Sequence, residues 1–262
     1  MGSRILKYSY LNDLLNVLYQ KLAIINEGSI KTQCEELENR YNVNILYNFD
    51  FPFQNEGCTL PSGLTIFSNP NPYQLKRILN NIDSALWVYP VEMINKYLSS
   101  INIVESMLYN NKQQIGPAGT YSLFNKSLYL SNIGSSDSSL QKAFHHEFSS
   151  LVRRLSDVQF PKNEWISIND SAFSYYYEKK DAVRIKEEDL LEQGFLEEYS
   201  TTLFDNDVEV FTSWLFYKPK ELAVVAQSHS KVLGKLKILY LYYKMIDSKI
   251  DFDNDIERLV NC

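Results

Sequence analysis

The sequence contains little cysteine: Cys34, Cys58 and Cys262 are its only three, and they lie far apart. An odd number of cysteines without a C-x-x-C pair provides neither a disulfide framework nor a cysteine-based metal site. The sequence also contains no run of about 18 apolar residues, so we expect no transmembrane segment. Its basic residues are scattered through a chain of net charge -6, so we expect no nucleic-acid partner.

The N-terminus lacks a recognisable secretion signal. The first residues, MGSRILKYSYL, do not follow the basic-then-apolar order of a signal peptide. Met1, Gly2 and Ser3 are nevertheless typical of a start that is added when a leader has been removed. We therefore expect the cell envelope or the extracellular space if a leader preceded this chain, and the cytoplasm otherwise.

The length and composition predict a chain that folds around a sizeable core. With 262 residues and 45% hydrophobic content, the chain can bury a large apolar interior. We predict an α+β fold that is mostly helical and has a small mixed sheet. An N-terminal helical portion (1–40) is expected to join a main domain (41–262) as one continuous structural unit.

Hydrophobic periodicity predicts the order of helices and strands. Gly28 and Ser29 are expected to separate two N-terminal helices, one over residues 9–26 and one ending near residue 39. Residues 158–184 are predicted to form a long aromatic loop. Further helices are expected at 72–86, 90–98, 138–155, from 205 to the proline at 219, 221–245 and 251–260, and strands at 43–49, 101–104 and within 119–131.

The helix predicted over residues 138–155, SSLQKAFHHEFSSLVRRL, carries two of the three histidines of the chain. Its apolar residues recur every three or four positions and make one stripe, formed by Leu140, Phe144, Phe148, Leu151, Val152 and Leu155. At about 100° per residue, His146, Ser150 and Arg153 lie opposite that stripe, with Glu147 at its shoulder. A histidine and a neighbouring acid are therefore expected to point away from the packing face.

This arrangement has a specific chemical interpretation. On a helix, H-E-x-x-H places two imidazoles one turn apart for Zn²⁺, and the glutamate acts as general base on the metal-bound water. Here the string is H-E-F-S-S, so Ser150 stands where the second histidine of that motif would be. Taken alone, such a half motif is more typical of an ordinary helix whose histidines lie on a solvated face.

A second helix, predicted to start near Asp205, carries two acids one turn apart. Asp205 and Glu209 are four residues apart and share one face. Near a histidine helix, such acids can supply a carboxylate ligand and its supporting partner. The alternative is that Asp205 is the N-cap and that Asp207 and Glu209 favour the first turn of an ordinary helix.

Residues 119–131 divide around Asn125 and Lys126 into two short alternating pieces, which predicts a hairpin or a bent edge strand just before the histidine helix. An edge strand beside such a helix can dock an extended peptide through its backbone. Tyr121 and Leu123 are then the candidate substrate-binding residues. An ordinary sheet strand explains the same periodicity.

Several segments, in a consistent order over roughly residues 40–260, carry a resemblance to a known family. They are YNVNILYNF, GTYSLFNKSLYLS before FHHEF, EWISINDSAFSYYYE, QGFLEEYSTTLFDNDVEVF and KLKILYLYYKMIDSKIDFDNDIERL. Together they resemble zinc-binding metallopeptidases of the gluzincin kind, including lipoproteins associated with outer-membrane nutrient import. The resemblance implies a zincin-like fold, a Zn²⁺ cofactor, a peptide or protein substrate, and a lipid anchor in the native precursor.

The resemblance also implies roles for particular residues. His146 matches the first metal ligand, Glu147 the general base and Tyr199 a donor to the developing oxyanion. An acid of the 205–209 region matches the carboxylate ligand, and Asp205 and Glu209 compete for that role because the family prefers glutamate where Asp205 stands. Ser150 departs from the family pattern because it stands where the second metal-binding histidine belongs, and a hydroxyl is a poor zinc ligand.

Two functions follow from these observations. The first is a zinc-dependent peptidase in which Glu147 deprotonates a metal-activated water. The alternative is a catalytically inactive descendant that binds a peptide or a partner protein in the same cleft. An α+β domain of unrelated function is the third interpretation of the sequence.

Overall fold

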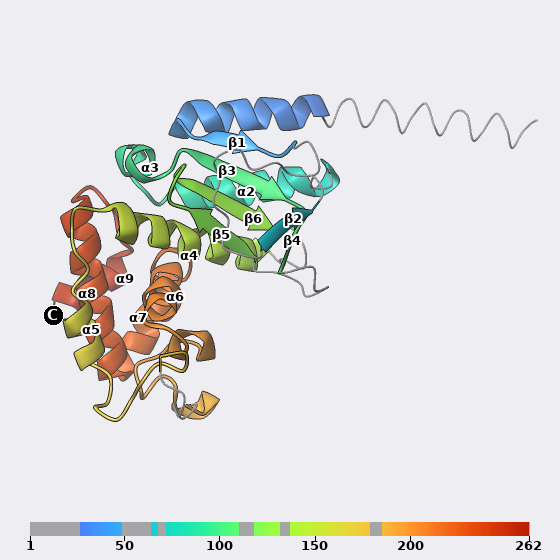
Figure 1. Ribbon diagram of the computed structural model, residues 1–262. Helices are drawn as coiled ribbons and strands as arrows, with labels where there is room; N and C mark the ends of the chain where they lie inside the picture. The colour runs from blue at the N-terminus through green and yellow to red at the C-terminus, as the bar shows by residue number, and fades with distance from the viewer. Residues whose placement is uncertain are drawn as a thin grey trace, which may run out of the picture.

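The computed structural model describes residues 27–48, 64–67, 72–109, 118–131, 137–178 and 185–261 (Figure 1). The helix predicted over residues 9–26 lies outside these ranges, so the division of the chain at residue 40 stays a prediction. Within the described residues the chain is mostly helical and contains a small mixed sheet, which confirms the predicted α+β class. No helix in the described ranges is long and apolar enough to cross a membrane.

Among the described residues, the main sheet has four strands in the order β1-β3-β6-β5. β3 is parallel to both of its neighbours, whereas β5 runs antiparallel to β6 and ends the sheet on that side. The predicted hairpin is therefore confirmed, with Gly119 opposite Leu130 and a turn in which Lys126 has a positive φ of 51°. The strands of this sheet are β1 (Asn44–Leu46), β3 (Ser100–Val104), β5 (Gly119–Ser122) and β6 (Ser127–Ser131), and a separate antiparallel pair consists of β2 (Leu64–Phe67) and β4 (Ser106–Tyr109).

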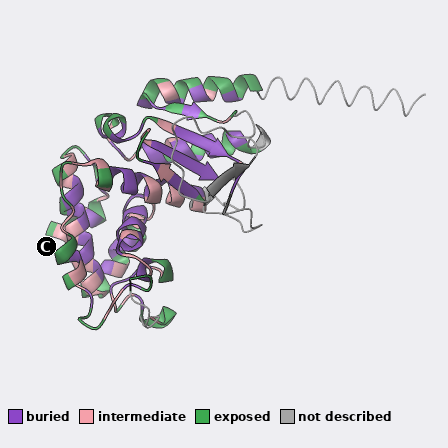
Figure 2. Ribbon diagram, in the orientation of Figure 1, coloured by how far each residue is buried: buried purple, intermediate pink, exposed green. Residues whose placement is uncertain are grey.

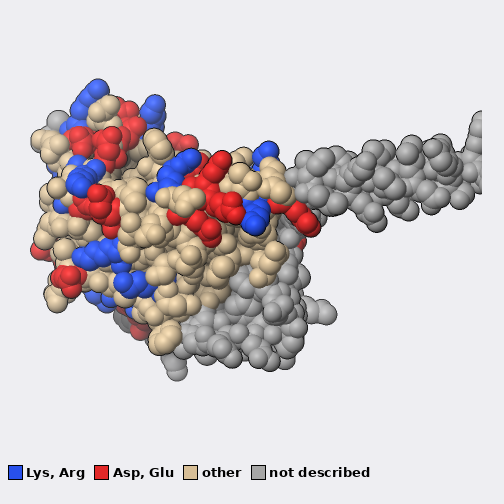
Figure 3. All heavy atoms as spheres, turned by 90° about the horizontal axis from the view of Figure 1, so that it is seen from above, with Lys and Arg blue, Asp and Glu red and all other residues tan. Residues whose placement is uncertain are grey.

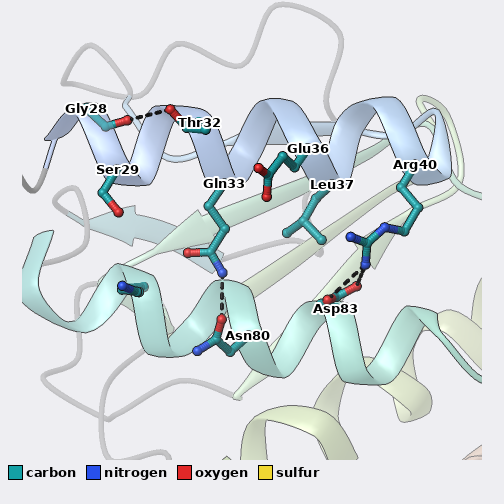
Figure 4. A pocket seen from close by; sticks show the side chains of 10 residues that line it. Gly28, Ser29, Thr32, Gln33, Glu36, Leu37, Arg40, Asn80 and Asp83 are labelled. Atoms are coloured by element: carbon teal, nitrogen blue, oxygen red, sulfur yellow. Dashed lines mark hydrogen bonds and ion pairs between the residues drawn. The ribbon is translucent and has the colours of Figure 1, made fainter.

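A helix over residues 27–41 packs beside α2 (Pro72–Leu86), and polar pairs join the two helices (Figure 4). Gln33 donates to Asn80 at 2.6 Å, and Arg40 forms a 2.9 Å ion pair with Asp83. Gly28 lies within this helix, so the predicted break at Gly28 is wrong. A glycine inside a helix costs only about 1 kcal/mol, which the packing of the rest of the helix offsets.

The histidine-bearing helix α4 (Asp137–Leu155) contacts the sheet, α2 and α6 (Phe204–Tyr217) (Figure 1). Its predicted apolar stripe is confirmed, since Phe144, Phe148 and Leu151 are at most 1% exposed. β3, β6 and most of α6 are buried as well (Figure 2). The core thus extends across α4, which leaves the opposite side of that helix to form a site.

The C-terminal half is helical and departs from the sequence prediction in two places. The expected aromatic loop contains a short helix, α5 (Lys162–Ser167). The single helix expected over 221–245 is two helices, α7 (Pro219–Ser228) and α8 (Ser230–Ile246), separated by His229 in an extended conformation. The apolar spacing continues from one helix to the next, so periodicity alone does not reveal the break. The other elements in the described ranges are α3 (Val91–Tyr97), α9 (Asn254–Asn261) and the short 3-10 helices η1 (Glu187–Asp189) and η2 (Glu198–Thr201).

Charged side chains of both signs are interspersed over the face of the molecule that Figure 3 shows. No broad basic surface is visible on the described part of that face.

Candidate functional site

A cavity of about 430 Å³ lies where α4, α6, β5 and η2 meet. The start of β5, one side of α4 and the η2 segment contribute residues to its lining. The lining residues are Ala118, Gly119, Ser139, Lys142, Ala143, His146, Glu147, Glu197, Tyr199 and Val210. Three of the residues singled out from the sequence, His146, Glu147 and Tyr199, therefore share one cavity.

His146 and Glu209 converge beside this cavity. His146 Nε2 lies 3.0 Å from Glu209 Oε2, and the two side chains are 15% and 6% exposed. The pair forms because α4 presents its polar side to α6 at the level of Glu209. The predicted meeting of His146 with a carboxylate of the 205–209 region is confirmed for Glu209.

Glu209 has further partners on α4. Ser150 Oγ donates a hydrogen bond to Glu209 Oε1, and Arg153 Nη2 contacts the same oxygen at 3.0 Å. Both carboxylate oxygens are therefore occupied, Oε2 by His146 and Oε1 by Ser150 and Arg153.

Asp205 faces a different set of groups. Its carboxylate pairs with Arg153 at 2.7 Å and with Arg154 at 2.6 Å. The N-cap of α6 is Leu203, so the alternative in which Asp205 caps the helix is wrong. Asp205 lies instead in the first turn, where its negative charge interacts favourably with the helix dipole.

The charges around the cavity influence one another. Burial opposes the charged form of His146, but the hydrogen bond and charge of Glu209 outweigh burial and raise the pKa of His146 above its ordinary value. Burial, with a contribution from Glu209, raises the pKa of Glu147 to about 7, although His146 opposes this shift. Glu147 can therefore carry a proton near neutral pH.

Gly119 allows β5 to pass close to Glu147. A Cβ atom at this position would lie 2.8 Å from Glu147 Cγ, which is closer than carbon atoms approach in folded proteins. The strand that forms one wall of the cavity therefore contacts α4 directly only because residue 119 has no side chain. Sequence periodicity gives no sign of this requirement.

Replacing Gly119 with alanine is expected to lower the free energy of unfolding by about 1–3 kcal/mol, because Glu147 or β5 must move. Chemical denaturation measures this loss. Gly28→Ala is the matched control, since nothing lies within 4 Å of a Cβ placed there and alanine favours a helix. An equal effect of the two substitutions would contradict the close packing of β5 on α4.

Of the other residues predicted for the site, Tyr199 lines the cavity, whereas Tyr121 and Leu123 do not. Tyr199 is 52% exposed, and the centroid of its ring lies 5.8 Å from that of the His146 ring. Tyr121 lies in β5, and burial raises the pKa of its hydroxyl. Leu123 is 41% exposed in the turn after β5 and does not line the cavity.

The structure also reveals groups that the sequence interpretation missed. Lys142 binds both carboxylate oxygens of Glu197 at the cavity wall, and Trp214 donates to Glu197 at 2.7 Å. His145 points into the core and lies 2.9 Å from the Tyr89 hydroxyl. Lys142 precedes His146 by one turn on the polar side of α4, which was the only available signal.

The residues present do not fit a zinc ion. A catalytic zinc site typically has three protein ligands, and the sequence offers His146 and Glu209 as two. Ser150 stands in the place of a second histidine, and its hydroxyl donates to Glu209. Arg153 brings a positive charge to the carboxylate that would have to bind the metal. Within the described ranges, no group of three or more His, Cys, Asp or Glu residues is arranged to hold a metal ion.

The fold and the cavity define a mostly helical α+β protein with a site between a helix pair and a sheet edge. The chain is similar in fold to the crystal structure of a "putative zinc-binding metallo-peptidase" from Bacteroides caccae, with a TM-score of 0.54. The two chains share 12% sequence identity over 90% of this chain and 91% of the other, so the likeness concerns the fold. No protein-family model and no curated protein sequence matches this chain.

Proposed function

We propose that this chain is a zincin-like protein that binds an extended peptide segment in the cavity between β5 and α4 and does not hydrolyse it through zinc. The observation that carries this proposal is the set of contacts on Glu209. The carboxylate expected to bind the metal is instead held by His146, Ser150 and Arg153. Of the two functions expected from the sequence, this arrangement favours the binding protein.

The location of the cavity supports a peptide as the ligand. β5 ends the four-stranded sheet and pairs with β6 on its other side. An extended segment can add to such an edge through main-chain hydrogen bonds, while pockets beside the edge receive its side chains. Ala118 and Gly119 place the beginning of β5 in the cavity wall.

The size and lining of the cavity also suit a peptide side chain. Ligand pockets usually enclose about 300–1,000 Å³, and this one encloses about 430 Å³. Ala143 and Val210 contribute apolar surface, and the exposed ring of Tyr199 borders the cavity. A tyrosine with an apolar ring and a polar tip is well suited to such contacts.

Measurements of metal content and peptide cleavage test the proposal that the protein does not hydrolyse peptides through zinc. Protein purified without chelator is expected to contain no stoichiometric zinc. A mixture of fluorogenic peptides is expected to be cleaved at the same background rate by the wild type and by Glu147→Gln. Stoichiometric zinc together with cleavage that depends on Glu147 would overturn the proposal and favour a zinc peptidase.

An array of unstructured peptides tests the binding half. The wild type is expected to retain a subset of the peptides, and Ala143→Phe is expected to weaken that binding at least about 10-fold because the ring fills the cavity. Val224→Ser is the control, since Val224 is 66% exposed on α7 and does not line the cavity. Equal binding by wild type and Ala143→Phe, or no binding by either, would contradict the proposal.

A further inference from the structure

We infer that the Arg153 guanidinium supplies the positive charge that a metal ion would supply at this site. By pairing with Glu209, Arg153 keeps that carboxylate unavailable to zinc. The inference rests on the absence of zinc chemistry that is part of the proposed function. It goes beyond that function because it assigns a role to Arg153 and predicts how a zinc site can be restored.

Arg153 is held in a fixed position. Its Nη1 lies 2.7 Å from Asp205 Oδ1 and its Nη2 lies 3.0 Å from Glu209 Oε1, so one guanidinium bridges two acids that are one turn apart on α6. The Arg153 side chain is only 10% exposed, and its guanidinium carbon lies 5.5 Å from the Phe204 ring centroid. A planar guanidinium that bridges two carboxylates is a specific and strong arrangement.

This position satisfies the charge of a buried acid. The Glu209 side chain is 6% exposed, and a carboxylate removed from water to that extent requires a compensating charge. In a zinc site the metal supplies this charge, whereas here Arg153 does so from the same helix as His146. Arg154 pairs with Asp205 alone among these acids, so the bridging role belongs to Arg153.

The contacts of Glu209 predict that the missing histidine is not the only obstacle to zinc. Ser150 lies one turn after His146 and its hydroxyl already reaches Glu209, so an imidazole introduced at position 150 would face the same point. The site would then offer two imidazoles and the Glu209 carboxylate as candidate ligands. Arg153 would still be paired with that carboxylate. Zinc would have to displace a buried ion pair before it could bind Glu209.

Zinc titration of three variants tests this inference. Ser150→His is expected to bind zinc weakly, and Ser150→His/Arg153→Met is expected to bind one zinc ion at least about 100-fold more tightly. Ser150→His/Arg154→Met is the matched control, because Arg154 is an adjacent arginine that contacts Asp205 and not Glu209. Its affinity is expected to equal that of Ser150→His. Competition with a chromogenic chelator gives the affinities, and elemental analysis gives the stoichiometry.

Two results would overturn the inference: tight zinc binding by Ser150→His alone, or no gain in a folded Ser150→His/Arg153→Met. If the methionine variant does not fold, Ser150→His/Arg153→Gln replaces it, because glutamine removes the charge but keeps an amide that can donate a hydrogen bond to the acids on α6. An intermediate gain is expected, and an affinity equal to that of Ser150→His would again contradict the inference. Stoichiometric zinc in the wild type would overturn both this inference and the proposed function, whereas failure of peptide binding alone leaves the zinc results unchanged.

Discussion

Replacing Lys235 with methionine is expected to lower the free energy of unfolding by about 3–5 kcal/mol, the typical cost of removing one partner from a buried ion pair. Lys235 and Asp207 are both 0% exposed, and Lys235 Nζ lies 2.7 Å from Asp207 Oδ2. The substitution keeps the length of the side chain but leaves the carboxylate without its cation. Urea denaturation followed by circular dichroism measures the loss.

A double substitution separates the lost charge from lost packing. Asp207→Asn/Lys235→Met removes both charges and keeps an acceptor for Trp165 Nε1 and the Tyr175 hydroxyl, each of which donates to Asp207 at 2.8 Å. It is expected to recover more than half of the stability lost by Lys235→Met. Equal losses in the single and double variants would show that the charge of Asp207 does not cause the effect.

An exposed ion pair on the same helix provides the control. Lys231 pairs with Asp170, and these side chains are 26% and 51% exposed. Lys231→Met is expected to change stability by no more than about 1 kcal/mol, because water already solvates both groups. Both substitutions remove one positive charge, so a larger loss of stability in Lys235→Met is attributable to the burial of its ion pair.

The buried pair also supports the candidate site. Asp207 precedes Glu209 by two residues on α6, and its partners come from α5, α8 and the segment after α5. Burial raises the pKa of Asp207 and lowers that of Lys235, although each group favours the charged form of the other. These contacts fix α6 against the rest of the helical part, and Glu209 thereby faces His146.

The parts of the fold that the sequence predicted are those determined by neighbouring residues. The apolar stripe of α4 follows from the spacing of Leu140, Phe144 and Phe148, and α2 and the β5–β6 hairpin follow from similarly local patterns. Hydrophobic periodicity did not reveal the helix break at His229, because the spacing of apolar residues continues unchanged from α7 to α8. It also missed α5, because that helix is too short to show a period.

In the candidate site, too, the sequence predicted what depends on neighbouring residues and missed what depends on how helices pack. Placing His146, Ser150 and Arg153 on one side of α4 required only helical geometry, and the structure confirms it through their shared partner Glu209. The choice between Asp205 and Glu209 could not be made, because both lie on one side of α6 and the choice depends on how two helices pack. The Arg153 contact joins residues 56 positions apart and therefore has no local signal.

The stability of the protein is expected to fall by about 2–3 kcal/mol between pH 6.5 and 4.5 on account of His145. This histidine is 1% exposed, and burial lowers its pKa from 6.5 to about 3. Between these two values the unfolded chain binds a proton that the folded chain excludes, so the free energy of unfolding decreases as the pH falls. The contribution is fully favourable above pH 6.5 and is lost progressively toward pH 3, at about 1.4 kcal/mol per pH unit.

A variant without this titration isolates the contribution from those of other groups such as Glu147. His145→Phe/Tyr89→Phe replaces both members of the 2.9 Å hydrogen bond, so no buried hydroxyl loses its partner. Phe216 lies against His145 with its centroid 5.8 Å away, and a phenyl ring at position 145 suits this aromatic environment. Denaturation at pH 6.5 and pH 4.5 is expected to show a smaller loss of stability in the variant than in the wild type. Equal losses would mean that His145 is protonated inside the folded protein, which its packing among Phe144, Tyr89 and Phe216 opposes.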